Sequence, residues 1–429
     1  MTKMLPNFIR FSIYTLVLLC SLKEESPILL LFFVMLSNIS IIFKTYRSLP
    51  LLLMFLFFLT YVVNLIPFFF NGDYIFYYPT TKGFYETLFI HALFLFSLDT
   101  FLFPIKSRFF INEKLSYKKN YVVFIILLVF FLLFLVFSIQ GDTVLDTGGY
   151  GREGKVKSLG GFGEYFLILI PLLYIYSGGI AFLNRIVMIL LLLMGIKLLL
   201  YGGRIGILMM GILYFILYWD TRKNKLSPFK LFSLSLPIIY ILVLIGSIRG
   251  NIALALNSSL GELFLLPFRG DFLSTYIEFF GNQNDIFYSS TILNQSALAG
   301  TISITTRLEM FFYNVLSIFV PYSFLPPEAA IIPYIQENIS PTGGGGLISA
   351  FAYFFLSYIG VILIGLYIAT LINTLQKTKN MILILYVIMV FSTYPRWFGY
   401  NIIALFKISF YIIPMYLLIE LLIKSICKK

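Results

Sequence analysis

The chain has 429 residues, of which 60% are hydrophobic and only 12% are charged, and its net charge is +12 at neutral pH. A soluble domain carries about twice this share of charged residues. The composition therefore excludes an ordinary soluble protein, and the mean hydropathy of +0.94 indicates a chain that lies mostly in a membrane. We interpret the positive charge as anchoring to anionic lipid of the inner leaflet, with no nucleic acid as a partner.

Apolar segments of about 20 residues, each long enough to cross the hydrocarbon of a bilayer, recur along the chain. Charged residues, prolines or glycines delimit about twelve of them, which predicts an all-α polytopic membrane protein. The predicted spans are 8–22, 27–43, 49–70, 84–104, 121–139, 162–178, 184–200, 204–219, 231–248, 347–373, 381–395 and 401–423.

Alternate loops between these spans are rich in lysine and arginine, as cytoplasmic loops are. The basic loops include those around Lys44, Lys118, Lys223 and Lys377, and the C-terminal lysines belong to the same set. The other short loops, such as 71–81, carry less net positive charge. Both ends of the chain are therefore predicted to face the cytoplasm.

Two longer segments are then predicted on the outer side, a glycine-rich one at 140–161 and a much longer one at 249–346. The predicted division of the chain is transmembrane helices one to nine at 1–248, a long periplasmic loop at 249–346, and helices ten to twelve at 347–429. Within the loop, the pattern of 260–280 predicts an amphipathic helix broken at Pro267. The segment 307–324 is interpreted as a re-entrant or interfacial helix, because a further span there would invert the C-terminal topology. The glycines at 343–346 are expected to form a flexible hinge.

The two sides of the predicted membrane protein differ in their cations. Cytoplasmic loops use mostly lysine, whereas the outer side from the fifth predicted helix onward carries more arginine. Arginine binds phosphate oxygens bidentately and stays charged when partly buried. We interpret the outer arginines as a binding pocket for a pyrophosphate. Its expected members are Arg204, Arg249, Arg269, Arg307 and Arg396. The alternative is that each arginine pairs with a local acid, such as Glu309 for Arg307, or reaches lipid headgroups.

A general base for chemistry at this face needs one carboxylate near the attacking hydroxyl group. The candidate catalytic residues are Glu262, Asp271 and Glu278, with Asp285, Glu309, Glu328 and Glu337 as alternatives that the sequence does not separate. The only histidine, His91, falls within a predicted span and is interpreted as a packed core residue. One histidine and two distant cysteines exclude a zinc-ligand cluster. We therefore expect no metal and no cofactor.

Three short motifs carry a family resemblance. Gly202-Gly203-Arg204 opens a predicted helix, Arg249-Gly250 opens the long loop, and the glycines at 343–346 precede the segment 350–360. With these motifs and its overall architecture, the chain resembles the O-antigen polymerases, bacterial membrane proteins that join lipid-linked oligosaccharide repeat units. The motifs are short, and the resemblance extends over the whole chain as an architecture.

The resemblance implies a metal-independent glycosyltransferase with a GT-C-like helical fold in the bacterial inner (cytoplasmic) membrane. Its substrate would be an oligosaccharide linked to undecaprenyl pyrophosphate, polymerised into O-antigen at the periplasmic face during lipopolysaccharide biosynthesis. The five arginines would hold the donor pyrophosphate and stabilise it as the leaving group. Related ligases use a loop histidine, which this loop lacks. The resemblance leaves room for a chain-length regulator protein as a further partner, and a flippase or an O-antigen ligase remain as alternatives.

Overall fold

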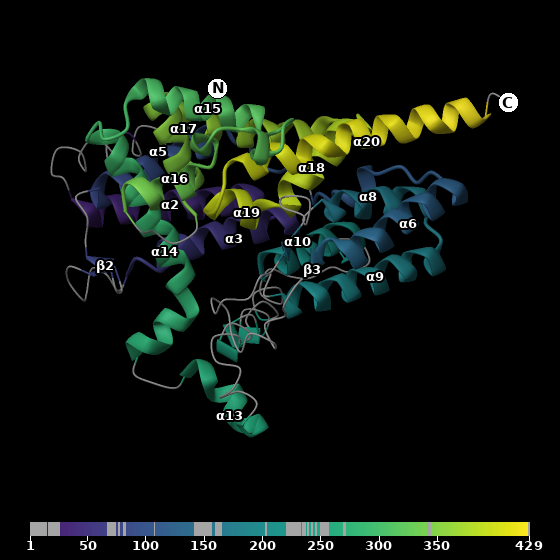
Figure 1. Cartoon of the computed structure of the whole chain (residues 1–429), viewed down its shortest axis with the longest axis horizontal. Helices are drawn as coiled ribbons and strands as arrows, with labels where there is room; N and C mark the ends of the chain where they lie inside the picture. Colours follow the sequence, from purple (N-terminus) through teal and green to yellow (C-terminus); the bar gives the residue numbers. More distant parts are fainter. Residues whose placement is uncertain are drawn as a thin grey trace. The chain divides into compact units, whose positions relative to one another are not determined.

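The computed structural model describes residues 26–66, 83–106, 108–140, 165–201, 204–219, 257–268, 272–340 and 345–427, with isolated pieces elsewhere (Figure 1). In this part of the chain nearly all secondary structure is α-helical. Two antiparallel pairs of two-residue strands are the exception. Strand β1 (Tyr74–Ile75) pairs with β2 (Tyr78–Pro79), and β3 (Ile139–Gln140) pairs with β4 (Lys157–Ser158).

The internal contacts divide the chain into two compact units. Unit 1 comprises Met1–Phe109, Gly281–Lys377 and Arg396–Lys407, and unit 2 comprises Phe110–Phe280, Thr378–Pro395 and Ile408–Lys429. The boundaries between the units fall inside three helices, namely α14 (Phe272–Leu298), α19 (Tyr394–Gly399) and α20 (Ile403–Cys427). The division into 1–248, 249–346 and 347–429 stays a prediction.

Unit 1 is built around helix α5, which packs along both α2 and α17 (Figure 1). Helix α3 packs against α2, and α15 packs against α17. Besides the helices that cross its boundary, the described helices of this unit are α2 (Pro27–Thr45), α3 (Leu49–Val63), α5 (Phe84–Phe101), α15 (Ile304–Leu316), η5 (Tyr322–Phe324), η6 (Pro327–Ala329), α16 (Ile331–Asn338) and α17 (Ile348–Lys377). An aromatic cluster fills part of the core, where Phe58 stacks on Phe398 with ring centroids 3.6 Å apart and meets Trp397 edge-on.

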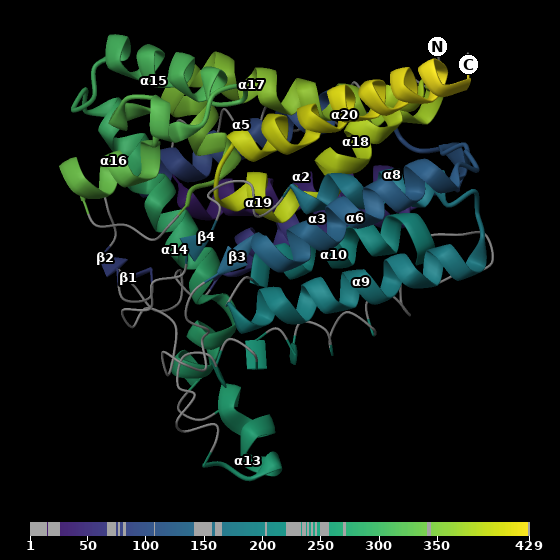
Figure 2. The ribbon, with the colours of Figure 1, turned by 45° about the vertical axis from the view of Figure 1, so that its right-hand side comes forward.

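Unit 2 contains four helices that lie side by side, α6, α8, α9 and α10 (Figure 2). Helix α18 packs against α8 and α10. The described elements of this unit are η1 (Asn112–Lys114), α6 (Tyr121–Phe137), α8 (Phe166–Tyr176), α9 (Ala181–Leu200), α10 (Arg204–Tyr214), the π-helical segment η3 (Phe215–Trp219), α13 (Leu260–Leu265), η4 (Leu266–Phe268) and α18 (Met381–Ser392).

Polar residues ahead of the apolar segments set where several helices begin. The side chains of Ser26, Asn120, Ser303 and Asn380 each accept a hydrogen bond from a main-chain N–H in the first turn of α2, α6, α15 and α18. Such N-cap residues satisfy N–H groups that have no partner within the helix. The helix starts are therefore encoded locally, even where the helix itself is uniformly apolar.

Five of the described helices are long and apolar enough to cross a membrane. They are Pro27–Thr45, Phe84–Phe101, Ala181–Leu198, Ile348–Lys377 and Ile403–Ser425. Shorter apolar helices accompany them, and α6 leaves Val122, Ile125 and Val136 exposed. Extended apolar surfaces of this kind are favourable in contact with lipid and unfavourable in contact with water. The chain is a helical membrane protein, as its composition predicted.

The predicted spans agree with the helices wherever the structure describes them. Every predicted span except 8–22 and 231–248 contains a helix, and those two lie largely outside the described residues. Several of the helices, such as the 11-residue α8 and α10, are shorter than the predicted spans. About 20 residues are needed to cross a bilayer, so helix length alone does not make each of them a span.

The segment 249–346, expected to be a long loop, contains four α-helices in its described part, α13, α14, α15 and α16. The helix in 260–280 is interrupted at Pro267 as predicted, since α13 ends at Leu265 and Pro267 lies in η4. Helix α15 has 13 residues and would extend about 20 Å, which is too short to span a bilayer. This length is compatible with the expected re-entrant or interfacial helix.

Helix α14 was not predicted as one continuous helix, because its buried face is polar. Asn284 accepts a hydrogen bond from the side chain of Asn64 at 2.6 Å, and Asn294 donates to Thr87 Oγ1 at 2.9 Å. Ser290 Oγ accepts from the main-chain N–H of Leu347 at 2.8 Å. These bonds hold the part of α14 from Gly281 onward against α3, α5 and the start of α17, so hydrogen bonding rather than hydropathy places this part in unit 1.

Candidate substrate-binding site

Helix α17 is broken within its first third. Leu356 and Ser357 leave helical geometry, and Ser357 has φ 53° and ψ −150°, a region that favours glycine. A side chain at Gly360 would collide with the carbonyl oxygen of Ala352 and with Leu356, so this kink needs glycine at residue 360. A break in a membrane helix frees carbonyl groups of the preceding turn, and these need other donors.

Arg307 supplies such a donor. It lies on the buried face of α15 together with Met310 and Asn314 and is only 8% exposed. Its Nη1 donates to the carbonyl oxygen of Phe354 at 3.2 Å, just before the break in α17, while its Nε has no hydrogen-bond partner. Glu309 lies on the exposed face of the same helix, and no ion pair of Arg307 is recorded among the described residues. The expected alternative, pairing with Glu309, is therefore not found.

A phenol lies within electrostatic reach of both this arginine and an acidic side chain. Tyr353, on α17, is near enough to Arg307 and to Glu86 for both charges to act on its hydroxyl group, which hydrogen-bonds to Tyr358. Glu86 Oε2 is buried and has no hydrogen-bond partner. A cation, a carboxylate and a phenol thus lie around the broken helix, which is a suitable group of side chains for binding an anion and moving a proton.

Arg396 belongs to the same compact unit as Arg307. Its guanidinium lies 5.9 Å from the ring centroid of Tyr400, and its carbonyl oxygen accepts the main-chain N–H of Asn401 at 3.0 Å. The last residue of α19, Gly399, packs closely against Gly345. A Cβ at Gly345 would lie 2.7 Å from the carbonyl oxygen of Gly399. The described part of the glycine run at 343–346 is therefore a close-packing position rather than a free hinge.

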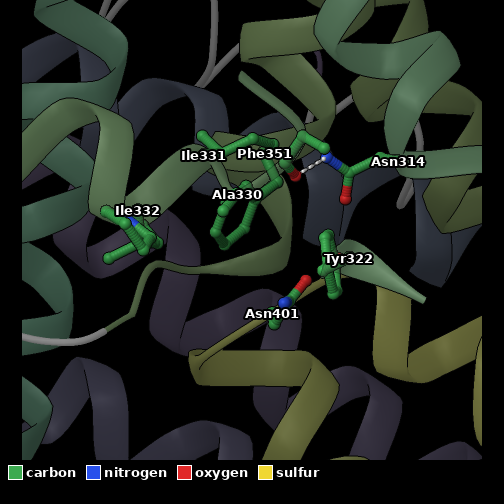
Figure 3. A pocket seen from close by; sticks show the side chains of 9 residues that line it. Asn314, Tyr322, Ala330, Ile331, Ile332, Phe351 and Asn401 are labelled. Atoms are coloured by element: carbon green, nitrogen blue, oxygen red, sulfur yellow. Dashed lines mark hydrogen bonds between the residues drawn. The ribbon is translucent and has the colours of Figure 1, made fainter. Parts of the chain in front are cut away.

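A cavity of about 190 Å³ lies within unit 1 (Figure 3). Its lining residues come from α15, the segment 322–333, the start of α17 and the turn before α20, and they are Asn314, Tyr322, Ala329, Ala330, Ile331, Ile332, Pro333, Phe351 and Asn401. Asn314 Nδ2 donates to the carbonyl oxygen of Ala329 at 3.0 Å and to that of Met310 at 3.3 Å. Outside the lining, Lys407 Nζ lies 5.1 Å from the centroid of the Tyr322 ring.

The side chains of the other arginines of the predicted set lie outside what the structure describes. Arg204 is the first residue of α10, as expected, but its side chain is not among the described ones. Arg249, Arg269 and Asp271 are outside the described residues, and Glu278 lies in α14 with its side chain likewise outside them. Their predicted roles stay predictions.

Glu262 has a structural task. Its Oε2 accepts hydrogen bonds from the main-chain N–H of Ser259 at 2.8 Å and from Ser259 Oγ at 2.9 Å, which completes a capping box at the start of α13. A capping box satisfies two otherwise unpaired N–H groups at a helix start. The exposed carboxylate is thus tied to the helix cap, and its proposed role as a base stays a prediction.

His91 is a packed core residue, as the sequence suggested. Its ring lies against Phe94 and Phe398, and its Nδ1 is 3.2 Å from Ser349 Oγ. With 2% exposure it has no access to solvent. The residue therefore helps to join α5 to the start of α17.

Sequence reasoning missed several polar residues of unit 1. Glu86 and Lys407 lie in predicted spans, and an ionisable residue inside an apolar segment is itself a signal of function that could have found them. The charge pattern places Lys44 in a cytoplasmic loop, yet its Nζ pairs with Asp99 Oδ1 at 3.0 Å, and both side chains are almost fully buried. No pattern in the sequence indicates that Asn314 and Tyr322 line the same cavity.

Comparison of the chain with known protein families, characterised proteins and solved structures found no match. In the described part of the chain, no group of three or more His, Cys, Asp or Glu side chains is placed to hold a metal ion. Any functional conclusion therefore rests on the side chains of the chain itself.

Proposed function

We propose that this chain is a membrane glycosyltransferase of the O-antigen polymerase kind, with about twelve spans and a GT-C-like arrangement. It would transfer a glycan from undecaprenyl pyrophosphate onto an incoming lipid-linked oligosaccharide repeat unit. The reaction would take place at the periplasmic face of the bacterial inner membrane without a metal ion. In this proposal the outer arginines bind the pyrophosphate and stabilise it as it leaves.

One observation carries the proposal, the buried guanidinium of Arg307. Burying a cation in a membrane protein costs several kcal/mol unless an anion or a set of carbonyl groups compensates it. Within the described residues Arg307 has one carbonyl partner, that of Phe354, and an unpartnered Nε. A phosphate group of the substrate is the kind of anion that would complete its hydrogen bonds.

Glycosyl transfer also needs a base for the acceptor hydroxyl group. Glu86 supports this step, because its Oε2 is buried without a partner and its charge reaches Tyr353, as does that of Arg307. We add Glu86 to Glu262, Asp271 and Glu278 as a candidate base. The carboxylate would accept the proton of the attacking hydroxyl as the glycosidic bond to pyrophosphate breaks.

A second candidate function is supported by the break in α17. Discontinuous membrane helices form the substrate sites of many transporters, and buried ion pairs such as Lys44 with Asp99 are common there. A flippase for the same lipid-linked units would use the same pyrophosphate contacts. The two functions differ in their product, since only the polymerase lengthens the glycan.

The first experiment is a lipopolysaccharide gel of a strain that lacks the gene. We expect loss of the long O-chain ladder with a single capped repeat unit remaining, whereas loss of a flippase would leave no repeat unit on the outer face. Complementation with Arg204→Ala or Arg249→Ala should fail to restore the ladder although the protein is inserted. A full ladder with both variants would contradict the pyrophosphate pocket.

A further inference from the structure

Tyr400 lies beside the guanidinium of Arg396, in the turn between α19 and α20. We propose that Tyr400 is a positioning residue which, together with Asn282 and Gly345, holds Arg396 in the orientation that binds a phosphate group. This inference rests on the proposed function, in which Arg396 is one of the pyrophosphate-binding arginines. It also assigns a role to Gly345, a member of the glycine run at 343–346.

The main chain of α19 is fixed in the core of unit 1. Trp397 and Phe398 are fully buried, and Phe58 of α3 stacks on Phe398 and meets Trp397 edge-on. Arg396 directly precedes these two anchors and is itself only half-buried. The anchors therefore hold the main chain of Arg396 but not its long side chain, and the direction of the guanidinium depends on its side-chain neighbours.

The ring of Tyr400 is one such neighbour. Its centroid lies 5.9 Å from the guanidinium carbon of Arg396. A guanidinium within about 6 Å of an aromatic ring centroid is attracted by the ring electrons. A contact of this kind uses none of the five N–H donors of an arginine, so it is compatible with bidentate binding of phosphate oxygens. The ring can thus orient the guanidinium without competing with a ligand.

Asn282 fixes the hydroxyl end of the Tyr400 ring. Its Nδ2 donates a hydrogen bond to Tyr400 Oη, and it lies in the part of α14 that belongs to unit 1. Two residues further on, Asn284 accepts a hydrogen bond from the side chain of Asn64 at 2.6 Å. The phenol is therefore tied to a helix that is itself hydrogen-bonded to α3.

Gly345 makes room for the other side of Tyr400. A Cβ at residue 345 would lie 3.1 Å from both Cα and Cδ1 of Tyr400. These distances are shorter than an ordinary van der Waals contact, so a larger residue at 345 would displace the ring or the main chain that carries it. Gly345 and Asn282 together fix the place of the ring, and the ring in turn fixes the place of the guanidinium.

The test is a double-mutant cycle on full-length protein in lipid nanodiscs, because a positioning residue acts only through the residue that it positions. The two probes are undecaprenyl pyrophosphate and undecaprenol, which has the same chain without phosphate. The variants are Tyr400→Leu, Arg396→Gln and the two changes combined. Tyr334→Leu is the matched control, because Tyr334 is also half-buried but lies on α16.

We expect wild-type protein to bind the pyrophosphate lipid more tightly than undecaprenol. Arg396→Gln should weaken binding of the pyrophosphate lipid at least about tenfold, and Tyr400→Leu should weaken it about threefold to tenfold. With Arg396→Gln present, Tyr400→Leu should have no further effect, and the control should bind as wild type does. An equal loss from Tyr400→Leu in both backgrounds, or no loss in either, would overturn the inference.

A conservative change separates positioning from a defect in folding. Tyr400→Phe keeps the ring and loses only the hydrogen bond from Asn282, so its affinity should stay within about threefold of wild type. Asn282→Ala should match it, and the two changes combined should be no worse than either alone. A correctly inserted Tyr400→Phe protein that binds as weakly as Arg396→Gln would contradict a role for the ring.

Polymer formation by the same samples distinguishes this inference from the proposed function. A wild-type protein that binds the pyrophosphate lipid without lengthening any glycan contradicts the polymerase and leaves the role of Tyr400 intact, provided that the cycle shows the coupling. A wild-type protein that does not distinguish the two lipids contradicts the pyrophosphate site and with it this inference. Polymer formation without coupling between Tyr400 and Arg396 refutes the inference alone.

Discussion

Arg307 on α15 donates a hydrogen bond to the carbonyl oxygen of Phe354, in the last turn before α17 breaks. The arginine thus satisfies a carbonyl group close to the break, at the end of a half-helix where the partial charge is negative. Its Nε is buried and has no hydrogen-bond partner among the described residues, and in the proposed function the guanidinium binds a phosphate oxygen. The link between a broken membrane helix and a buried cation is the basis of the functional account.

Replacing Arg307 tests this link. Arg307→Lys keeps the charge but loses the planar fork, so we expect at least about a tenfold decrease in polymer formed, consistent with the value of a charge-assisted hydrogen bond. The measurement is the O-chain ladder in a complemented strain, normalised to the amount of inserted protein. Arg47→Lys is the control, because Arg47 is exposed and its ladder should match wild type. A wild-type ladder from Arg307→Lys would show that the fork is not needed.

Ser357 tests the strain at the break. Its positive φ is costly for any residue other than glycine, so Ser357→Gly should raise the free energy of unfolding by about 1 kcal/mol. Ser357→Ala should give no such gain. Thermal unfolding of the purified protein in detergent measures both. In contrast, Ser425→Gly in the regular helix α20 should lower the stability, and a matching decrease for Ser357→Gly would mean that α17 is continuous.

The sequence predicted a helical membrane protein because the length and hydrophobicity of a segment are local properties, whereas the sidedness inferred from the basic residues stays a prediction. It also located the interruption at Pro267, since proline acts within its own turn. The break at Leu356 and Ser357 left no such mark, because neither residue is a helix breaker. That break depends on Gly360 and on contacts with α15, which are set by tertiary packing.

Close packing of two glycines is the basis of a third prediction. A Cβ at Gly345 would lie 2.7 Å from the carbonyl oxygen of Gly399, and one at Gly399 would lie 2.5 Å from Tyr61 Oη. Gly345→Ala and Gly399→Ala should each destabilise the protein by about 1–3 kcal/mol through overpacking. Gly211→Ala is the control, because nothing lies within 4 Å of the added methyl group in α10. Equal melting temperatures for Gly345→Ala and wild type would rule out the close contact.

The buried pair of Lys44 and Asp99 is the basis of a fourth prediction. Removing one partner leaves an uncompensated buried charge, so Lys44→Met or Asp99→Leu should each cost about 3–5 kcal/mol. Removing both should restore most of the stability, because neither charge is then left alone. Fluorescence-detected size exclusion with heating measures all three variants. A double variant as unstable as the single ones would show that the pair does not act as a unit.

The candidate site could be predicted from the sequence only in part, because tertiary packing brings its residues together. The bias toward arginine in the segments predicted on the outer side is visible in the sequence, and Arg307 and Arg396 belong to one compact unit. Asn314 and Asn401 are far apart in the sequence and are common residue types, so no local pattern connects them. The cavity exists because α15, α17 and the start of α20 come together, which a single sequence does not reveal.

Polymer formation by purified protein tests the central claim most directly. The wild-type chain is reconstituted into vesicles with lipid-linked repeat units in the presence of EDTA, and the glycan length is read on a gel. We expect a ladder of glycans longer than one unit from the wild-type chain, and no ladder with Arg307→Lys. Vesicles in which every glycan keeps the length of one unit, while the lipid moves between leaflets, would contradict the polymerase and identify a flippase instead.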